Sequence, residues 1–231
     1  MSLDLAHDPV DVRPTTRIAA FFDVDNTLLP GSASELRFFR YLWRHDIVGW
    51  RETVRSVAHL LRHMPPVSYQ PLRVRKLYLE GKSPEVLDDL AERFSRAHLI
   101  PALSRQALAR LESHREAGHE VVLVTGSLEN LILPLARHLG VETVIAARLV
   151  RDACGYTGHV YPPLPYGEGK RALIEAWSQA RSIHLPSSYA YGDSPGDVAL
   201  LEVVGNPLVV NPIRGMEQVA QRRNWSVIRW E

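Results

Sequence analysis

Short runs of apolar residues, each bounded by polar ones, recur along this chain and predict buried strands. The first covers residues 17–24 (RIAAFFDV) and the second residues 120–125 (EVVLVT). Three later runs have the same character: residues 144–150, 188–191 and 207–210. Helical patterns separate these runs, over residues 128–139, 169–180, 198–203 and a last one to about 222. Because strands and helices alternate, we expect an α/β fold with a Rossmann-like parallel sheet and helices on both faces.

The stretch between the first two strands has a different pattern. Over residues 35–117 apolar side chains recur at three- and four-residue spacing, which predicts helices. Pro65 and Pro66 interrupt this region, because proline cannot continue a helix. Ser83, followed directly by a proline, has the capping hydroxyl of a helix start and predicts a helix over residues 85–97.

These patterns divide the chain into two domains. Residues 1–30 and 118–231 are expected to form the α/β core, and residues 31–117 an all-helical cap inserted after the first strand. Whether the last helix of the cap packs on the core is left open. Residues 152–160 are interpreted as a turn or hairpin, and those up to about 15 as a loose tail.

Composition narrows the class of protein. The chain has 231 residues, of which 45% are hydrophobic and 23% charged, and its formal net charge is +1. These values are ordinary for a globular protein and give no reason to expect a nucleic-acid or membrane partner, so we expect a small-molecule partner. The amino terminus lacks the apolar segment of a signal peptide, and Cys154 has no second cysteine to pair with, which favours the cytoplasm. The sequence does not indicate an oligomeric state.

Four short motifs stand at or just beyond the carboxyl ends of predicted strands, the edge where open α/β sheets bind ligands. In chain order they are Asp23 with Asp25, Thr125-Gly126-Ser127, Lys170 at a helix start, and Gly192 to Asp197, which contains Asp193. Each motif alone is weak, since an Asp-x-Asp arises by chance, an aspartate-rich turn can merely cap a helix, and a lone lysine is usually a surface residue. Their order, each on its own strand end, points to one shared site.

The residue types in these motifs suit a phosphorylated ligand. Alternation along a strand would point Asp23 and Asp25 the same way, and two neighbouring carboxylates imply a metal ion or a shared proton. Thr125 offers a hydroxyl, and with Gly126 it stands where a strand turns into a helix whose N–H groups suit phosphate.

With these four motifs in order, the chain resembles the haloacid dehalogenase superfamily, in the subclass similar to phosphoserine phosphatases. The resemblance covers residues 17–230 and includes the helical cap after the first strand. It implies a phosphatase in which Asp23 is the nucleophile that carries the phosphoryl group. It further implies that Asp25 protonates the leaving alcohol and then deprotonates the attacking water.

The resemblance also implies a cofactor, Mg²⁺, and the groups around it. Asp23, the backbone carbonyl of Asp25 and Asp193 would hold the ion, and Asp197 would fix Lys170 or a metal-bound water. The phosphoryl oxygens would be held by a further set of residues: Thr125, Gly126 and Lys170.

The residues that select the substrate are expected in the cap. Phosphoserine phosphatases carry a glutamate nine residues after the nucleophile, whereas this chain has Ser32 there, with Glu35 as the nearest acid. Residues 71–80 predict a short helix with Arg75 at the edge of its apolar face and Arg73 pointing away, so Arg75 is the candidate for binding a substrate anion. Phosphoserine and histidinol phosphate both stay candidate substrates.

Two other functions remain open. A phosphotransferase of the same fold would pass the phosphoryl group to an alcohol instead of water, and a catalytically silent binding protein would keep the fold alone. Intact Asp23, Asp25, Lys170 and Asp193 argue against the silent protein.

Overall fold

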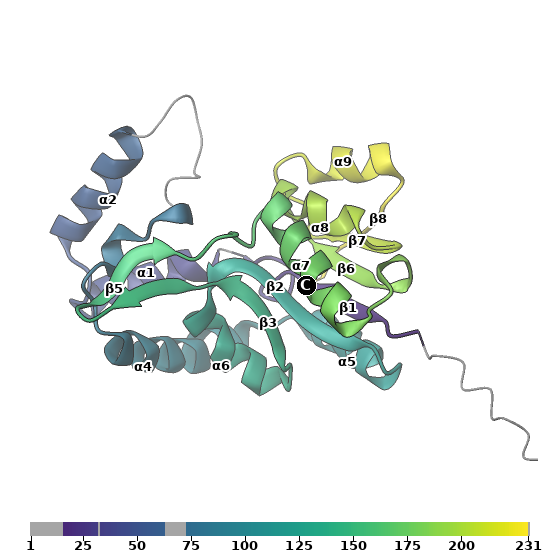
Figure 1. The fold of residues 1–231 in the computed structure, drawn as a ribbon, viewed down its shortest axis with the longest axis horizontal. Helices are drawn as coiled ribbons and strands as arrows, with labels where there is room; N and C mark the ends of the chain where they lie inside the picture. The colour runs from purple at the N-terminus through teal and green to yellow at the C-terminus, as the bar shows by residue number, and fades with distance from the viewer. Residues whose placement is uncertain (1–15, 32, 63–72, 231) are drawn as a thin grey trace, which may run out of the picture.

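The centre of the molecule is a six-stranded sheet in which every neighbouring pair is parallel. The computed structural model describes residues 16–31, 33–62 and 73–230. The strand order is β3-β2-β1-β6-β7-β8 (Figure 1). The strands are β1 (Ala19–Phe22), β2 (Glu120–Leu128), β3 (Thr143–Ala147), β6 (Tyr189–Gly192), β7 (Asn206–Val210) and β8 (Ser226–Ile228). The predicted α/β fold is confirmed, and β8 is an edge strand that the sequence did not predict.

Alternating side chains of the strands point to two separate cores. Ala20 and Phe22 of β1 belong to one apolar cluster, and Ala19 and Phe21 belong to the other. The first cluster is closed by α5 (Arg105–Glu116) and α6 (Glu129–Leu139), and the second by α7 (Glu168–Arg181), α8 (Val198–Glu202) and α9 (Met216–Arg223). Figure 1 shows these two groups of helices on opposite sides of the sheet.

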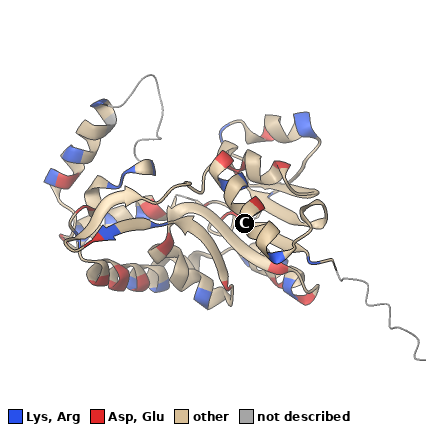
Figure 2. Cartoon of the chain, in the orientation of Figure 1, with Lys and Arg blue, Asp and Glu red and all other residues tan. Residues whose placement is uncertain are grey.

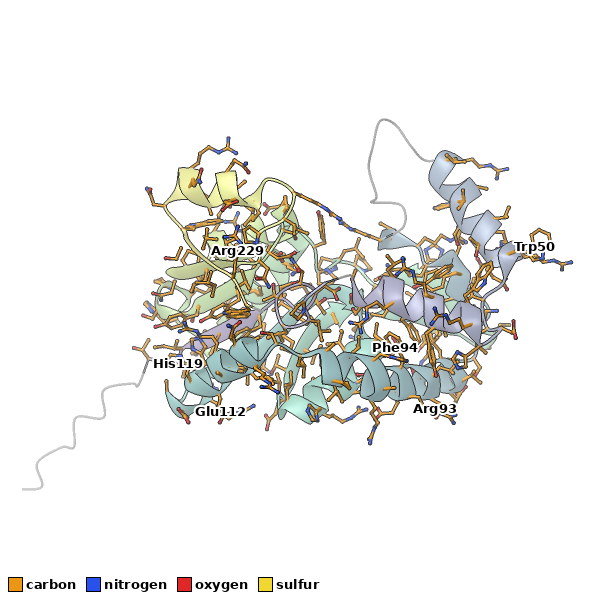
Figure 3. The ribbon with its side chains drawn as sticks, turned by 180° about the vertical axis from the view of Figure 1, so that it is seen from behind. Trp50, Arg93, Phe94, Glu112, His119 and Arg229 are labelled. Atoms are coloured by element: carbon orange, nitrogen blue, oxygen red, sulfur yellow. The ribbon has the colours of Figure 1, made fainter. Side chains whose placement is uncertain are left out.

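The insertion after β1 is built mainly from helices. They are α1 (Ser34–Arg44), α2 (Trp50–Arg62), a 3₁₀ turn η1 (Leu77–Leu79), α4 (Pro84–Phe94), a π turn η2 (Ser95–Leu99), a 3₁₀ turn η3 (Ile100–Ala102) and then α5. The Ser83 hydroxyl accepts a hydrogen bond from the Val86 N–H, so α4 starts where its cap predicts. Seen from behind, α4 with Phe94 leads into α5, whose end lies near Glu112 and His119 (Figure 3). The helix α5 thus packs on the sheet.

A hairpin from the other half of the chain joins this insertion. The strands β4 (Leu149–Asp152) and β5 (Gly155–Val160) are antiparallel, as the turn pattern predicts. The backbone N–H of Lys76 donates to the Gly158 carbonyl at 2.6 Å, and that of Gly81 donates to the Tyr156 carbonyl at 2.7 Å. The cap layer is therefore not all-helical, and part of the range 118–231 expected in the core pairs with it.

The same pairing interrupts the helix predicted over residues 71–80. Residues 71 and 72 lie outside the described part of the chain, and Arg75 forms an antiparallel bridge with His159. Arg73 and Val74 are helical, Arg75 lies at the bridge, and Leu77–Leu79 form a separate 3₁₀ turn. The predicted continuous helix is wrong because the backbone here bonds across to the hairpin instead of along itself.

Charged side chains of both signs are scattered over the helices (Figure 2). Several pair within one helix, as Arg93 does with Asp89 at 2.9 Å. Exposed pairs of this kind add at most about 1 kcal/mol each. Among the described residues, no helix combines the length and apolar character needed to cross a lipid bilayer.

A buried histidine links α5 to the sheet. His114 Nε2 lies 2.7 Å from the Tyr191 hydroxyl of β6, and its Nδ1 lies 2.8 Å from Nδ1 of His119. Burial, with smaller contributions from His119 and Arg110, lowers the pKa of His114 from 6.5 to about 4. Folding therefore favours the neutral imidazole.

This depressed pKa predicts a loss of stability in mild acid. A histidine that is neutral when folded but titrates at about 6.5 when unfolded stabilises the fold above pH 6.5, and that contribution is lost as the pH falls towards 4. Urea titrations at pH 7 and pH 4 give the decrease in the free energy of unfolding between these two pH values. We expect this decrease to be smaller in His114→Gln than in the wild type, by on the order of 2 kcal/mol. The control is His138→Gln, at an exposed position of α6, which should follow the wild-type curve. Parallel curves for all three proteins would contradict the assignment.

Candidate active site

The predicted motifs meet at the carboxyl edge of the sheet because β1 lies between β2 and β6 and all three strands run the same way. Asp23 follows β1, Thr125 lies within β2 and Asp193 follows β6. They line a cavity of about 450 Å³. The other motif residues in its wall are Asp25, Gly126, Ser127, Lys170 and Asp197. The structure thus brings together all of the core residues that the sequence singled out.

Lys170 is the centre of the site and is only 2% exposed. Its ammonium donates to Asp23 Oδ1 and to Asp197 Oδ1, both at 2.5 Å, and to the Val124 carbonyl at 3.0 Å. A glycine is required one residue earlier, since a Cβ on Gly169 would lie 1.8 Å from the Leu164 carbonyl oxygen. The first turn of α7 therefore places the Lys170 side chain between the carboxylates of Asp23 and Asp197.

The loop after β6 holds two further aspartates. Asp197 accepts hydrogen bonds from the Ser194 N–H at 3.1 Å and from the Ser194 hydroxyl at 2.8 Å. A Cβ on Gly192 would lie 2.5 Å from that of Asp197, so only glycine allows this close turn. Asp193 accepts from the Asn26 side-chain amide at 3.0 Å, which orients it towards the end of β1.

Asp25 does not join this group of acids. Its carboxylate accepts from the Ser34 N–H at 2.7 Å and from the Ser127 hydroxyl at 2.6 Å. The expectation that Asp23 and Asp25 extend one strand fails because β1 ends at Phe22 and the chain turns at Asn26, whose φ is 56°. Asp25 thus connects the first turn of α1 to β2.

Burial dominates the electrostatics of these acids. It raises the pKa of Asp25 against the opposing hydrogen bonds of Ser127 and Ser34. It also raises the pKa of Asp193 to about 7, with the charge of Asp197 adding to the effect. The pKa of Asp23 is raised well above its ordinary value, first by burial and against the attraction of Lys170. For Lys170, burial alone would lower the pKa, but Asp197 and Asp23 more than offset it and the pKa is raised.

The acid cluster fits a divalent cation. Asp23, Asp193 and Asp197 each offer a carboxylate oxygen, and these three atoms lie within 4.8 Å of one another. Of these three carboxylates, Asp23 and Asp197 share one ammonium, that of Lys170. Mg²⁺ prefers oxygen ligands, and its charge would balance the excess negative charge of these carboxylates. The carboxylate of Asp25 is not part of this cluster. The prediction that Asp25 binds the metal ion through its backbone carbonyl therefore stays a prediction.

The comparison with protein families agrees with this geometry. A model of haloacid dehalogenase-like hydrolases matches residues 20–202. The chain belongs to this family.

Similar proteins extend over almost all of the chain. A probable phosphatase of Mycobacterium tuberculosis is 29% identical over 225 residues, which are 95% of this chain and 78% of that protein. A histidinol-phosphatase of Neisseria meningitidis is 28% identical over 219 residues, which cover 92% and 98% of the two chains. A crystal structure from Bordetella pertussis, of unknown function, is 32% identical, with a TM-score of 0.80 over 93% of this chain and 99% of that one. These findings confirm a phosphatase of the haloacid dehalogenase-like family.

The three predicted cap residues lie in different places. Ser32 lies outside the described residues. Glu35 lines the catalytic cavity, but it already accepts from Lys76, at 2.7 Å, and from the Tyr78 hydroxyl at 2.8 Å. Arg75 lines an adjoining cavity instead, where it lies 3.8 Å from Glu80.

Arg73 and Lys76 are the cap cations that reach the catalytic cavity. The Arg73 guanidinium lies 3.3 Å from the centre of the Tyr166 ring, which joins the insertion to the core. The sequence placed Arg73 on the outer side of a helix. The backbone at Arg73 is helical, but its side chain lines the cavity, so the predicted outward direction is wrong. The three cations within residues 73–76 were the signal that could have directed attention to Lys76.

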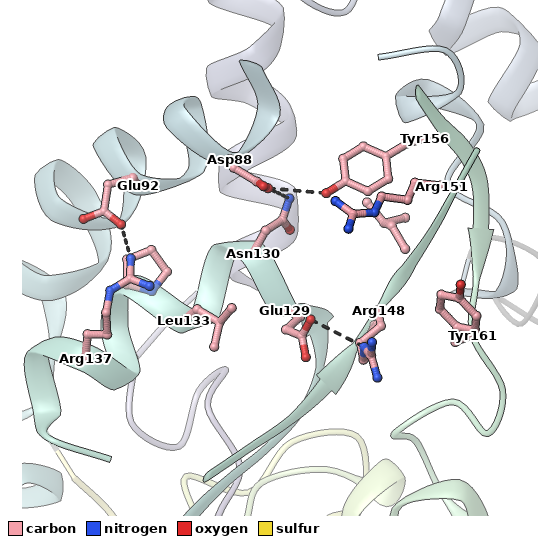
Figure 4. Close-up of a pocket in the computed structure, with 13 residues that line it drawn as sticks. Asp88, Glu92, Glu129, Asn130, Leu133, Arg137, Arg148, Arg151, Tyr156 and Tyr161 are labelled. Carbon is pink, nitrogen blue, oxygen red and sulfur yellow. Dashed lines mark hydrogen bonds and ion pairs between the residues drawn. The ribbon is translucent and has the colours of Figure 1, made fainter. Parts of the chain in front are cut away.

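A further cavity of about 510 Å³ lies between α4, α6 and the hairpin, away from the catalytic residues (Figure 4). Several of its polar and charged groups pair with one another. The pairs are Glu92 with Arg137, Glu129 with Arg148, and Asp88 with both Asn130 and Tyr156. It contains none of the predicted motif residues, so we do not assign the reaction to it.

Proposed function

We propose that this chain is a Mg²⁺-dependent phosphomonoester hydrolase that acts on a small phosphorylated metabolite through an aspartyl-phosphate on Asp23. The observation that carries the proposal is the buried Lys170, which contacts Asp23 and Asp197 at 2.5 Å beside Asp193. A nucleophilic carboxylate next to a fixed ammonium suits a phosphoryl group, whose oxygens need positive partners. Mg²⁺ held by Asp23 and Asp193 would supply further positive charge for those oxygens.

The reaction can be written with the residues of the cavity. A carboxylate oxygen of Asp23 attacks phosphorus, and the bond between phosphorus and the leaving oxygen breaks. Asp25, whose pKa burial raises, gives its proton to the leaving alcohol. Asp25 then takes a proton from the water that attacks the aspartyl-phosphate, which releases phosphate and restores Asp23. Thr125, Gly126 and Lys170 would hold the phosphoryl oxygens.

The substrate is proposed at the level of a class. Amino-alcohol phosphates such as phosphoserine and histidinol phosphate belong to this class, with support from the histidinol-phosphatase relative. A cytoplasmic location is part of the same proposal, because the exposed Cys154 is the chain's single cysteine and has no disulfide.

The metal requirement gives the first test. With p-nitrophenyl phosphate as substrate, we expect activity in Mg²⁺, loss of at least about 100-fold after EDTA treatment and dialysis, and recovery when Mg²⁺ returns. Calcium should inhibit, because the larger ion prefers more oxygen ligands and could bind both oxygens of the Asp23 carboxylate. Full activity in EDTA would refute the metal-dependent hydrolase.

A further inference from the structure

The catalytic cavity adjoins a second one of about 560 Å³, which is lined in part by α1 and α2 of the cap. The two share a border of five residues: Ala33, Glu35, Leu36, Arg73 and Lys76. A molecule held at Asp23 that extends past this border comes to lie in the second cavity. Only the leaving group of a phosphomonoester could make that extension.

The wall of this second cavity, here called the cap pocket, carries apolar side chains that are open to solvent. Leu36 is 47% exposed and Val57 is 49% exposed. Phe39 lies beside them, with its ring 5.2 Å from that of Tyr78. Apolar surface gathered in a concave site next to catalytic groups is typical of ligand pockets, because covering it removes that surface from water.

Of the three charged residues at the border, Glu35 and Lys76 are paired with each other, and Arg73 lies over the Tyr166 ring. The Glu35 carboxylate accepts from Lys76, which is 5% exposed, and from the Tyr78 hydroxyl. A substrate ammonium would compete with these two donors for the Glu35 carboxylate. A neutral apolar group passes the border without breaking either contact.

We propose that the preferred substrate is the phosphomonoester of an alcohol with an alkyl or aryl portion, and that this portion occupies the cap pocket. The proposal rests on the proposed function, since the phosphoryl group must lie at Asp23. It deepens that function by naming the preferred leaving group. We expect a substrate with an apolar leaving group to be preferred over phosphoserine, whose leaving group is small and zwitterionic.

A series of unbranched alkyl phosphates, from ethyl to octyl, tests the proposal on the wild-type enzyme with Mg²⁺. Their leaving alcohols differ little in reactivity, so a dependence on length reports binding. We expect kcat/KM to rise about two- to fourfold for each added methylene until the pocket is filled, mainly through KM. Hexyl phosphate should also exceed phosphoserine. A flat series would overturn the proposal while leaving the phosphatase intact.

Matched variants locate the effect. Val57→Thr places a hydroxyl in the cap pocket, and we expect it to lower the ratio of kcat/KM for hexyl over ethyl phosphate about three- to tenfold. Val54→Thr is the control, since Val54 is on the same helix and 55% exposed but does not line the pocket. Equal ratios in both variants and the wild type would contradict the assignment of the pocket.

Calorimetric binding of n-alkylphosphonates, which cannot be hydrolysed, separates this proposal from the proposed function. If no phosphate ester is hydrolysed but phosphonate affinity still rises with chain length and falls in Val57→Thr, the function fails and the apolar site stands. If affinity is independent of chain length, the site fails. A change of oligomeric state in Val57→Thr without a change in chain-length preference would assign the pocket to contact with a second copy, which also overturns the proposal.

Discussion

Asp23→Asn is expected to lower kcat by at least about a thousandfold, on the scale seen when a nucleophile is removed. An amide oxygen does not attack phosphorus, and it is a poorer metal ligand than a carboxylate. The fold should remain, because Lys170 keeps its contact with Asp197 at 2.5 Å. Removing one charge from the cluster with Asp193 and Asp197 also relieves repulsion between buried carboxylates.

The measurement is steady-state hydrolysis of p-nitrophenyl phosphate, paired with a thermal melt. The control is Asp89→Asn, which makes the same chemical change at an exposed position of α4 and should keep full activity. Residual activity of Asp23→Asn above about 1% of the wild type would contradict its role as nucleophile.

Asp25→Asn should separate substrates by their leaving groups. For an alkyl phosphate, whose leaving alkoxide needs a proton, we expect a loss of about 10²- to 10⁴-fold, the usual contribution of general acid catalysis. For p-nitrophenyl phosphate, whose phenolate leaves unprotonated, the loss should be within about tenfold. The local structure should persist, because an amide oxygen can still accept from the Ser34 N–H and the amide nitrogen can donate to Ser127.

Ser127→Ala is the matched control for this experiment. It removes one hydrogen bond to Asp25 and leaves the carboxyl group, so its effect should be small and similar on both substrates. An equal loss on both substrates in Asp25→Asn would show that Asp25 serves only to hold α1 against β2.

Most of the sheet and the core site follow from local patterns. Apolar runs located the central strands, and the parallel direction of the strands brought their carboxyl ends together, which is why Asp23, Lys170 and Asp193 meet as predicted. Gly140, with φ of 63°, ends α6 as the sequence pattern indicates.

The errors arise where distant parts of the chain decide the local structure. The extended backbone at Arg75 exists because it pairs with His159, 84 residues later, as the two residue numbers give. β8 is three residues long, too short for a periodic signal, and forms only beside β7. Alternation along β1 misplaced Asp25 because the strand stops before it. The pairing of Lys76 with Glu35 is likewise a tertiary contact that no spacing in the sequence reveals.

The aspartyl-phosphate on Asp23 can be trapped directly. The enzyme would be mixed with Mg²⁺ and an excess of p-nitrophenyl phosphate, quenched in acid during steady turnover, and reduced with borohydride, which converts an aspartyl-phosphate to homoserine. Peptide mass mapping then reports the modified residue. The account predicts homoserine at position 23 and at no other aspartate. An unmodified Asp23 in enzyme sampled during turnover, or a phosphoryl group on another residue, would contradict it.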